Sequence, residues 1–118
     1  MQKLTNKEEE LMHHFWQHGA MFVKDIVLLY DEPKPHINTI STMVRTLETK
    51  GYVDHEAFGN TYRYYPVISH EEFSKGVLGS VVTRYFENSY RQVVSALIEE
   101  EKISISELEE LIRKVNNQ

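Results

Sequence analysis

The residues best suited to recognition chemistry lie in the stretch HINTISTMVRTLETKGYV, residues 36–53. Apolar residues recur in it at helical spacing, which predicts a helix with one face against the protein body. They are Ile37, Ile40, Val44 and Leu47, with Met43 at their border. Exposed helix faces are usually rich in Glu, Lys and Gln, which favour helix formation and solubility. The opposite arc of this helix instead carries small hydrogen-bonding side chains and one cation: Asn38, Thr39, Ser41, Thr42, Arg45 and Thr46.

This polar arc has the composition that reading DNA in the major groove requires. Compact donors and acceptors let a helix lie deep in the groove, and an arginine can reach guanine or phosphate. Threonine methyl groups can also touch thymine methyl groups. The alternative is a solvated helix face without a binding role. We interpret the arc as a DNA-reading surface.

A second group of candidate DNA contacts follows in residues 52–67. Here the apolar period becomes strand-like, and YVDHEAF and TYRYYPV flank a Gly-Asn dipeptide. This pattern is typical of a β-hairpin with a two-residue loop. Asn60 in the turn and Arg63 near it could meet phosphates or the minor groove, whereas Asp54 and Glu56 would repel phosphate unless they point away. We expect this hairpin to touch DNA weakly.

Metal and catalytic chemistry have less support in the sequence. His14 and His18 are four residues apart, a spacing that can hold a metal ion, but no third ligand lies near them in sequence. His14 also shares a helix face with Leu11, so we interpret it as a half-buried packing residue. The sequence has no Gly-rich phosphate loop and no nucleophile elbow. We therefore predict no metal site, no cofactor and no enzymatic activity.

Composition narrows the class of protein. The chain has 118 residues, 41% hydrophobic and 26% charged, which is ordinary for a globular protein. The absence of cysteine excludes disulfides, thiolate metal sites and cysteine nucleophiles, and it makes a cytoplasmic location plausible. A net charge of −5 counts against indiscriminate nucleic-acid binding, but not against specific binding by a locally sorted surface. No apolar run approaches the roughly 20 residues of a transmembrane helix, so we expect no membrane insertion.

The elements that must position these residues follow a recognisable order. A Thr5–Glu8 capping box predicts a helix over residues 6–18. Residues 21–23 are either a short strand rung or the lead into a second helix that ends near Asp31. The helix described first ends near Gly51, and the hairpin comes after it. Three helices followed by a hairpin form the winged-helix plan, in which the third helix enters the major groove. We assign residues 1–67 to a winged helix-turn-helix domain for DNA binding.

The sequence of residues 68–118 predicts three further helices. Their starts are expected at Ser69, at Asn88 or Ser89, and at Ser104. Their apolar stripes are too large for isolated helices to leave in water. Folding back on the first domain could cover them, and so could a second copy. A two-fold dimer would also present two reading helices to two half-sites. We predict a mostly α protein with a small β-hairpin, and a homodimer through these helices, with Phe73, Val77, Val81, Tyr85, Val94, Leu97, Leu108 and Leu111 in the interface.

These segments together resemble the penicillinase-repressor family of bacterial winged-helix regulators, which includes repressors of β-lactamase and methicillin-resistance genes. The carriers of the resemblance are LTNKEEELMHHFWQHG, NTISTMVRTLETKGYV, YRYYPVISHEEF and ALIEEEKISISELEEL. The resemblance implies a homodimeric transcriptional repressor that binds a palindromic double-stranded DNA operator. It also implies that Asn38, Thr39, Ser41, Thr42 and Arg45 lie on the operator-contacting helix.

The resemblance implies one further partner, a sensor protease, and this chain differs from characterised family members in two respects. In characterised family members a membrane-bound sensor protease leads to cleavage of the repressor in the dimerisation region. The matching segment here is about Ala96-Leu97, which lacks the Asn-Phe pair found there, so proteolytic induction does not carry over directly. The copper-responsive branch ends in a cysteine-rich hook, which this chain cannot form. Two other readings stay open, a winged-helix protein-interaction module without DNA readout and a repressor with an effector pocket.

Overall fold

The fold is mostly α-helical with one small sheet, as the sequence predicts. A computed structural model describes residues 2–117, and within that range the chain forms six helices and three strands. The chain divides into two compact units, one ending at Lys75 and the other beginning at Gly76. The assignment of residues 1–67 to DNA binding and 68–118 to dimerisation is a functional division and stays a prediction.

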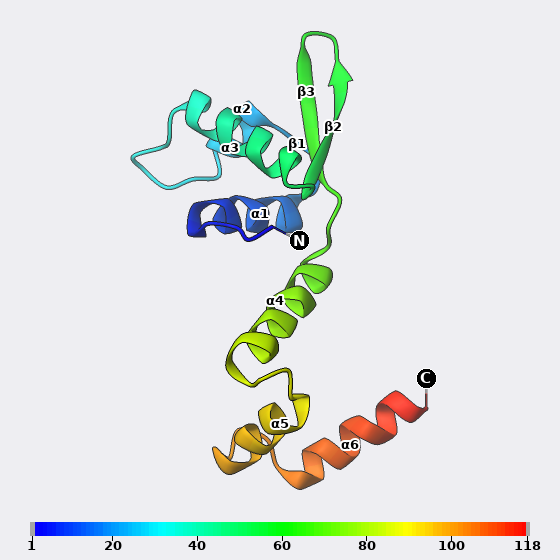
Figure 1. The fold of residues 1–118 in the computed structure, drawn as a ribbon. Helices are drawn as coiled ribbons and strands as arrows, with labels where there is room; N and C mark the ends of the chain where they lie inside the picture. Colours follow the sequence, from blue (N-terminus) through cyan, green and yellow to red (C-terminus); the bar gives the residue numbers. More distant parts are fainter. Residues whose placement is uncertain (1, 118) are drawn as a thin grey trace. The chain divides into compact units, whose positions relative to one another are not determined.

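The first unit contains the elements of a winged helix (Figure 1). In chain order they are α1 (Asn6–His18), β1 (Met21–Phe22), α2 (Val23–Val27), α3 (Ile37–Thr49), β2 (Val53–Phe58) and β3 (Thr61–Pro66). The predicted bounds of the first helix are confirmed, and so is its capping box. The Thr5 hydroxyl accepts from the Glu8 amide at 3.2 Å, and the Glu8 carboxylate accepts from the Thr5 amide at 2.8 Å.

The sheet joins the hairpin to the segment before α2. Its strand order is β1-β3-β2, all antiparallel, with Met21 opposite Tyr64 and Phe22 opposite Arg63. Residues 21 and 22 are therefore a strand rung, and α2 begins directly after them. Because β1 pairs with Arg63 and Tyr64 of β3, it attaches the hairpin to the segment before α2.

The predicted extent of the second helix is wrong, because α2 ends at Val27 and not near Asp31. The next two amides bond three residues back: Leu29 to the Ile26 carbonyl at 3.0 Å and Tyr30 to the Val27 carbonyl at 3.3 Å. These tight turns end the regular α-helix. The prolines at 33 and 35 also lack the N–H that a continuing helix needs.

A single apolar core holds the first unit together. Ile40, Val44 and Leu47 of α3 are at most 1% exposed, and they pack with residues of α1, α2 and the sheet. The rest of this core includes Leu11, Met12, Phe15, Ile26, Tyr52, Val53 and Tyr64. Ile37, predicted on the same inward stripe, is instead 45% exposed. It lies in the first turn of α3, beyond the part of the helix that packs on the core.

Aromatic packing attaches the chain after the hairpin to α1. The Trp16 indole N–H donates to the Ile68 carbonyl at 2.8 Å. The Phe73 ring, in the first turns of α4 (His70–Tyr85), lies 5.2 Å from the Trp16 ring and 6.2 Å from the Tyr52 ring, measured between centroids. The start of α4 is thereby part of the first unit's packing.

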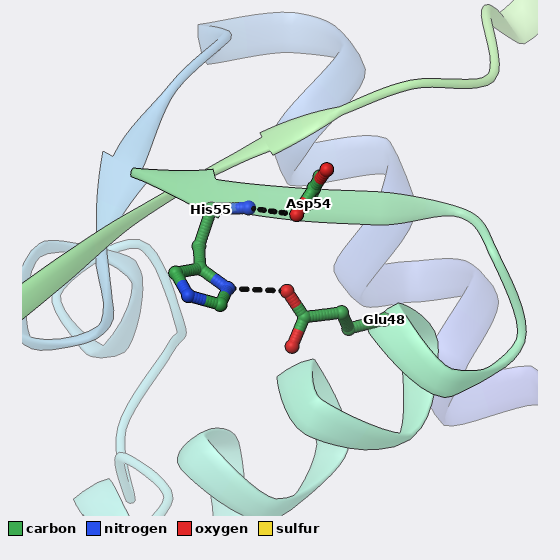
Figure 2. Close-up of side chains that lie close together, drawn as sticks. All are labelled: Glu48, Asp54 and His55. Atoms are coloured by element: carbon green, nitrogen blue, oxygen red, sulfur yellow. Dashed lines mark hydrogen bonds and ion pairs between the residues drawn. The ribbon is translucent and has the colours of Figure 1, made fainter. Parts of the chain in front are cut away.

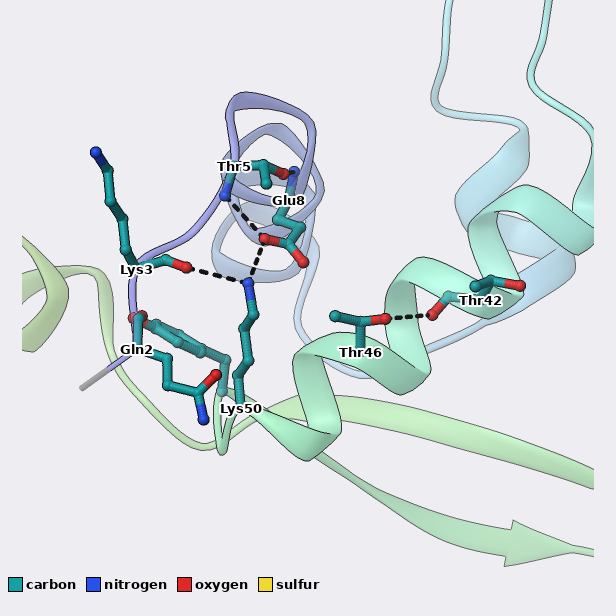
Figure 3. A network of polar contacts seen from close by, with 8 residues as sticks. Gln2, Lys3, Thr5, Glu8, Thr42, Thr46 and Lys50 are labelled. Carbon is teal, nitrogen blue, oxygen red and sulfur yellow. Dashed lines mark hydrogen bonds and ion pairs between the residues drawn. The ribbon is translucent and has the colours of Figure 1, made fainter.

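Two polar contacts hold the C-terminal end of α3. In one, the Glu48 carboxylate meets the His55 ring of β2 (Figure 2). In the other, the Lys50 ammonium donates to the Glu8 carboxylate at 2.7 Å and to the Lys3 carbonyl at 3.0 Å (Figure 3). Together they tie the end of α3 to the wing on one side and to the start of α1 on the other.

Glu8 is a buried carboxylate, with 6% of the residue exposed. Burial alone would raise its pKa, but hydrogen bonds from Lys50 and from the Thr5 amide outweigh burial and lower the pKa below its ordinary value of 4.5. The side chains of Lys50 and Glu8 are only 18% and 9% exposed, so water screens this pair weakly. An uncompensated charge would remain if either partner were removed.

The second unit contains the rest of α4, α5 (Tyr90–Glu99) and α6 (Ile105–Asn116). The predicted helix starts are confirmed: the hydroxyls of Ser69, Ser89 and Ser104 each accept from an amide three residues on. Val82 of α4 is fully buried, whereas α5 and α6, both inside the described range, contain no buried residue. Among residues 2–117, no helix combines the length and the apolar character needed to cross a membrane.

We expect Lys50→Met to destabilise the protein by about 2–3 kcal/mol, because it leaves the Glu8 carboxylate buried without its cation. The measurement is urea-induced unfolding at pH 7. Lys75→Met is the matched control, since the Lys75–Glu71 pair is exposed and should contribute less than about 1 kcal/mol. Equal unfolding free energies for the two variants would contradict a structural role for the Lys50–Glu8 pair.

The same pair predicts a dependence of stability on pH. The pKa of Glu8 is lowered by folding, so its contribution is present above pH 4.5, the ordinary value, and is lost as the pH falls through the lower folded pKa. The difference in unfolding free energy between wild type and Lys50→Met should therefore narrow as the pH falls from 4.5 through the lower folded pKa of Glu8. Denaturant titrations between pH 7 and pH 3 measure it, and parallel curves for the two proteins would refute the assignment.

Candidate nucleic-acid interface

The candidate interface is the outer face of α3, beside the hairpin of β2 and β3 (Figure 1). The burial of Ile40, Val44 and Leu47 fixes the rotation of α3 about its axis. With these three inward, the helix turns Asn38, Thr39, Thr42 and Arg45 to solvent, and Ser41 and Thr46 are partly covered at its edges. The structure therefore brings all six α3 residues predicted to read DNA onto one continuous outer arc.

Threonine hydroxyls on α3 bond back to the helix. Thr42 donates to the Asn38 carbonyl at 2.9 Å, Thr46 to the Thr42 carbonyl at 3.0 Å, and Thr49 to the Arg45 carbonyl at 3.0 Å. The first two of these residues are labelled in Figure 3. Back-bonding to the residue four earlier occupies each hydroxyl proton and limits the side-chain rotamers. The threonines thus offer oxygen lone pairs and methyl groups to a partner.

Arg45 is the one long cation on α3. Its guanidinium lies 3.5 Å from the Thr42 hydroxyl, a contact at the limit of hydrogen bonding, and the residue is exposed. Burial raises the pKa of the Tyr64 phenol above its ordinary value of 10.0; the charge of Glu48 adds to this increase, and that of Arg45 opposes it. The charges of Arg45 and Glu48 therefore both lie close enough to the hairpin to influence Tyr64 of β3.

The hairpin has the predicted two-residue loop, with Val53 opposite Pro66 and Phe58 opposite Thr61. Gly59 adopts a φ of 60°, a left-handed conformation that suits glycine. Asn60, the second loop residue, is exposed. Asp54 and Glu56 are both exposed on β2.

Arg63 is more constrained than Asn60. It lies in the central strand β3, between Phe22 and Glu56. Its guanidinium lies over the Phe58 ring at 4.8 Å and within 3.7 Å of the Glu56 carboxylate. A phosphate contact by Arg63 would have to compete with these two neighbours.

Two lysines near α3 are engaged within the protein. The Lys34 ammonium donates to the carbonyls of Tyr30 and Leu28, at 2.6 and 3.2 Å. The Lys50 ammonium is held by Glu8. The positive charge that α3 itself presents to solvent is therefore that of Arg45.

His14 packs as the sequence predicts. It is half-buried, and its ring centroid lies 4.8 Å from that of Tyr30. Burial lowers the pKa of His14 below its ordinary value of 6.5. A different set of metal-type ligands is formed by Glu48, Asp54 and His55, which sequence inspection does not single out. The available signal is a carboxylate in the last turn of a helix followed by an Asp-His pair at the start of the next strand.

The residues predicted for dimerisation are in two environments. Phe73 packs against the first unit through Trp16 and Tyr52. The other seven belong to the second unit, where Val94 and Leu108 are partly covered and the remaining five are 37–69% exposed: Val77, Val81, Tyr85, Leu97 and Leu111.

Comparison with known proteins places the chain in a family. The family model described as penicillinase repressor matches residues 4–117. The penicillinase repressor of Bacillus licheniformis is 23% identical over 110 residues, covering 92% of this chain and 86% of that protein. The methicillin resistance regulatory protein MecI of Staphylococcus aureus (strain N315) is 21% identical over 115 residues, and that of Mammaliicoccus sciuri 22% over 119, each covering 97% of this chain and 94% of its own. Because the family model spans nearly the whole chain, this protein belongs to the penicillinase repressor family.

Proposed function

We propose that this protein is a homodimeric, sequence-specific DNA-binding repressor of transcription. In this proposal α3 of each subunit docks in the operator major groove and blocks transcription sterically. Membership in a family of transcriptional repressors supports the general role, and the names of the relatives, a penicillinase repressor and methicillin resistance regulators, agree with it. The same membership favours a repressor over an enzyme.

The observation that carries the proposal is the chemistry of the exposed face of α3. From Ile37 to Leu47 the helix contains no carboxylate, although the whole chain has a net charge of −5. A face without acids can approach phosphates without repulsion, and the positive N-terminal end of a helix favours them. Acidic residues are thus absent from α3 between Ile37 and Leu47, and its one carboxylate, that of Glu48, lies in the last turn.

Four polar residues of α3, namely Asn38, Thr42, Arg45 and Thr46, have a matching function in a groove. The Asn38 side chain can pair with adenine, and Arg45 can pair with guanine or contact phosphate. The hydroxyls of Thr42 and Thr46 are already bonded to helix carbonyls, so these residues would contribute acceptor oxygens and thymine-methyl contacts. Asn60 at the hairpin tip would add a backbone contact, and Arg63 would do so only after leaving Glu56.

The exposed apolar faces of the second unit support dimerisation. The apolar residues of α6 recur at helical spacing and form one stripe, yet Leu111, Ile112 and Val115 are 50–66% exposed. Monomeric proteins rarely leave such continuous apolar surface in water. A second copy would cover it and place two α3 helices on one DNA, as two half-sites require. Cleavage-dependent release stays a prediction from the family, and Ala96-Leu97 lies within α5.

We expect Arg45→Ala to weaken binding to the preferred operator by about 1–3 kcal/mol, roughly 5- to 150-fold, if Arg45 reads a base. The operator is first recovered by selection from random DNA, and affinity is then measured by fluorescence anisotropy. Arg113→Ala, which removes the same charge from the exposed surface of α6, is the control and should bind normally. Loss of affinity on all sequences, with a salt slope smaller by about 1, would assign Arg45 to phosphate. Unchanged affinity would contradict any contact.

We expect the wild type to sediment at about twice 13.9 kDa at micromolar concentration. Leu97→Asp should shift it towards monomer, because a charge buried in an apolar interface is costly. Ser95→Asp is the matched control, since it adds the same charge two positions earlier, on the other side of α5. A wild-type monomer at all concentrations would refute the dimer.

A further inference from the structure

Three side chains with metal-binding atoms meet where α3 ends and the wing begins. Glu48 lies in the last turn of α3, and Asp54 and His55 are consecutive in β2. Each offers one ligand atom, and these atoms all lie within 4.8 Å of one another. Figure 2 shows the Glu48 carboxylate facing the His55 ring, with the Asp54 carboxylate beside the His55 backbone.

The backbone around these residues is firmly held. Gly51, with a φ of 86°, ends α3, and the next amide, that of Tyr52, donates to the Leu47 carbonyl at 2.9 Å. Tyr52 is 1% exposed, so the turn between helix and strand is anchored in the core. Glu48 and His55 therefore project from a fixed corner, and little conformational entropy would be lost on binding a ligand there.

Neighbouring groups contact two of the three ligand side chains. The Asp54 carboxylate accepts from the His55 amide at 2.8 Å. The His55 ring lies 4.3 Å from the Tyr62 ring and 5.5 Å from the Tyr64 ring, measured between centroids. The side chains of His55 and Glu48 are 33% and 29% exposed, so the corner is partly shielded but open to an ion.

One imidazole nitrogen and two carboxylate oxygens form a donor set that suits Zn²⁺, with a fourth position left for water. Ligands of zinc lie about 2.0–2.2 Å from the ion, so binding would draw the three groups inward, chiefly by rotation of the exposed Asp54 side chain. The His14–His18 spacing on α1 supplies only two ligands, and His14 is packed against Tyr30. The corner between α3 and β2 is thus the richer donor set.

We propose that Glu48, Asp54 and His55 bind a divalent transition-metal ion, with Zn²⁺ as the representative, between α3 and the hairpin of β2 and β3. The imidazole must be neutral to coordinate the ion. Without metal, the carboxylates of Glu48 and Asp54 place two negative charges where α3 ends and β2 begins, and a divalent ion would cancel both. If α3 enters DNA, as the proposed function has it, zinc should strengthen operator binding by removing this repulsion of phosphate.

The direct test measures metal binding alone. The full chain is treated with a chelator and titrated with Zn²⁺ in competition with a chromogenic indicator and by calorimetry. One ion per chain is expected, and His55→Ala and Asp54→Asn should each weaken binding by about tenfold or more. Asp54 is exposed, so its variant should fold, which circular dichroism checks.

The control is the double variant His14→Ala/His18→Ala, which removes the competing pair on α1. It should retain zinc binding at the wild-type affinity. The proposal is overturned if wild type binds zinc no better than His55→Ala, which would leave an ordinary carboxylate–imidazole hydrogen bond. It is equally overturned if zinc binding disappears in the α1 double variant and persists in Asp54→Asn.

A second measurement connects the site to DNA and separates the two proposals. Operator affinity with and without Zn²⁺ should differ in wild type, in the direction of tighter binding with zinc, and should not differ in Asp54→Asn. A protein that binds zinc through these residues but selects no DNA would refute the proposed function and leave the metal site standing. A protein that binds its operator equally with and without zinc would refute the coupling.

Discussion

The burial of three side chains, Ile40, Val44 and Leu47, is the constraint on which the candidate interface depends. Their apolar surface can leave water only by packing on α1, α2 and the sheet, and this packing fixes how α3 is rotated. This rotation determines which residues of α3 face outward. The polar arc from Asn38 to Thr46 faces outward because the apolar residues on the opposite side of α3 are buried. The candidate interface is therefore the side of α3 that the core does not use.

Polar contacts complete what apolar packing begins. The core sets the rotation of α3, whereas Lys50 with Glu8 and Glu48 with His55 attach its C-terminal end to α1 and to β2. All four residues are charged or ionisable, and if α3 enters DNA as proposed, an unpaired Glu48 carboxylate would repel phosphate. Its contact with His55 gives this acidic residue a partner at the end of α3. The same corner collects the donors proposed to bind metal.

The two units use their apolar residues differently. In the first unit the side chains at helical spacing are buried within one chain, so the unit has a complete core. In the second unit the same kind of spacing on α5 and α6 leaves the apolar residues largely exposed. Amphipathic helices without a covered face are typical of association surfaces. The first unit, which contains α3, thus covers its own apolar residues, whereas the second unit, where the dimer is proposed, leaves most of its apolar residues exposed.

Local signals in the sequence were enough for the helix starts, the hairpin loop and the polar arc, because capping boxes, Gly-Asn turns and apolar periodicity act over a few residues. The family resemblance was also readable, from the order of these signals along the chain. Tertiary structure decided what depends on distant partners: the exposure of Ile37, the pairing of β1 with β3, and the engagement of Arg63 by Glu56 and Phe58. It also decided that Lys50 binds Glu8, 42 residues away, and that Glu48 meets His55. Spacing reveals which residues share a face, but only the folded chain determines which charges meet across it.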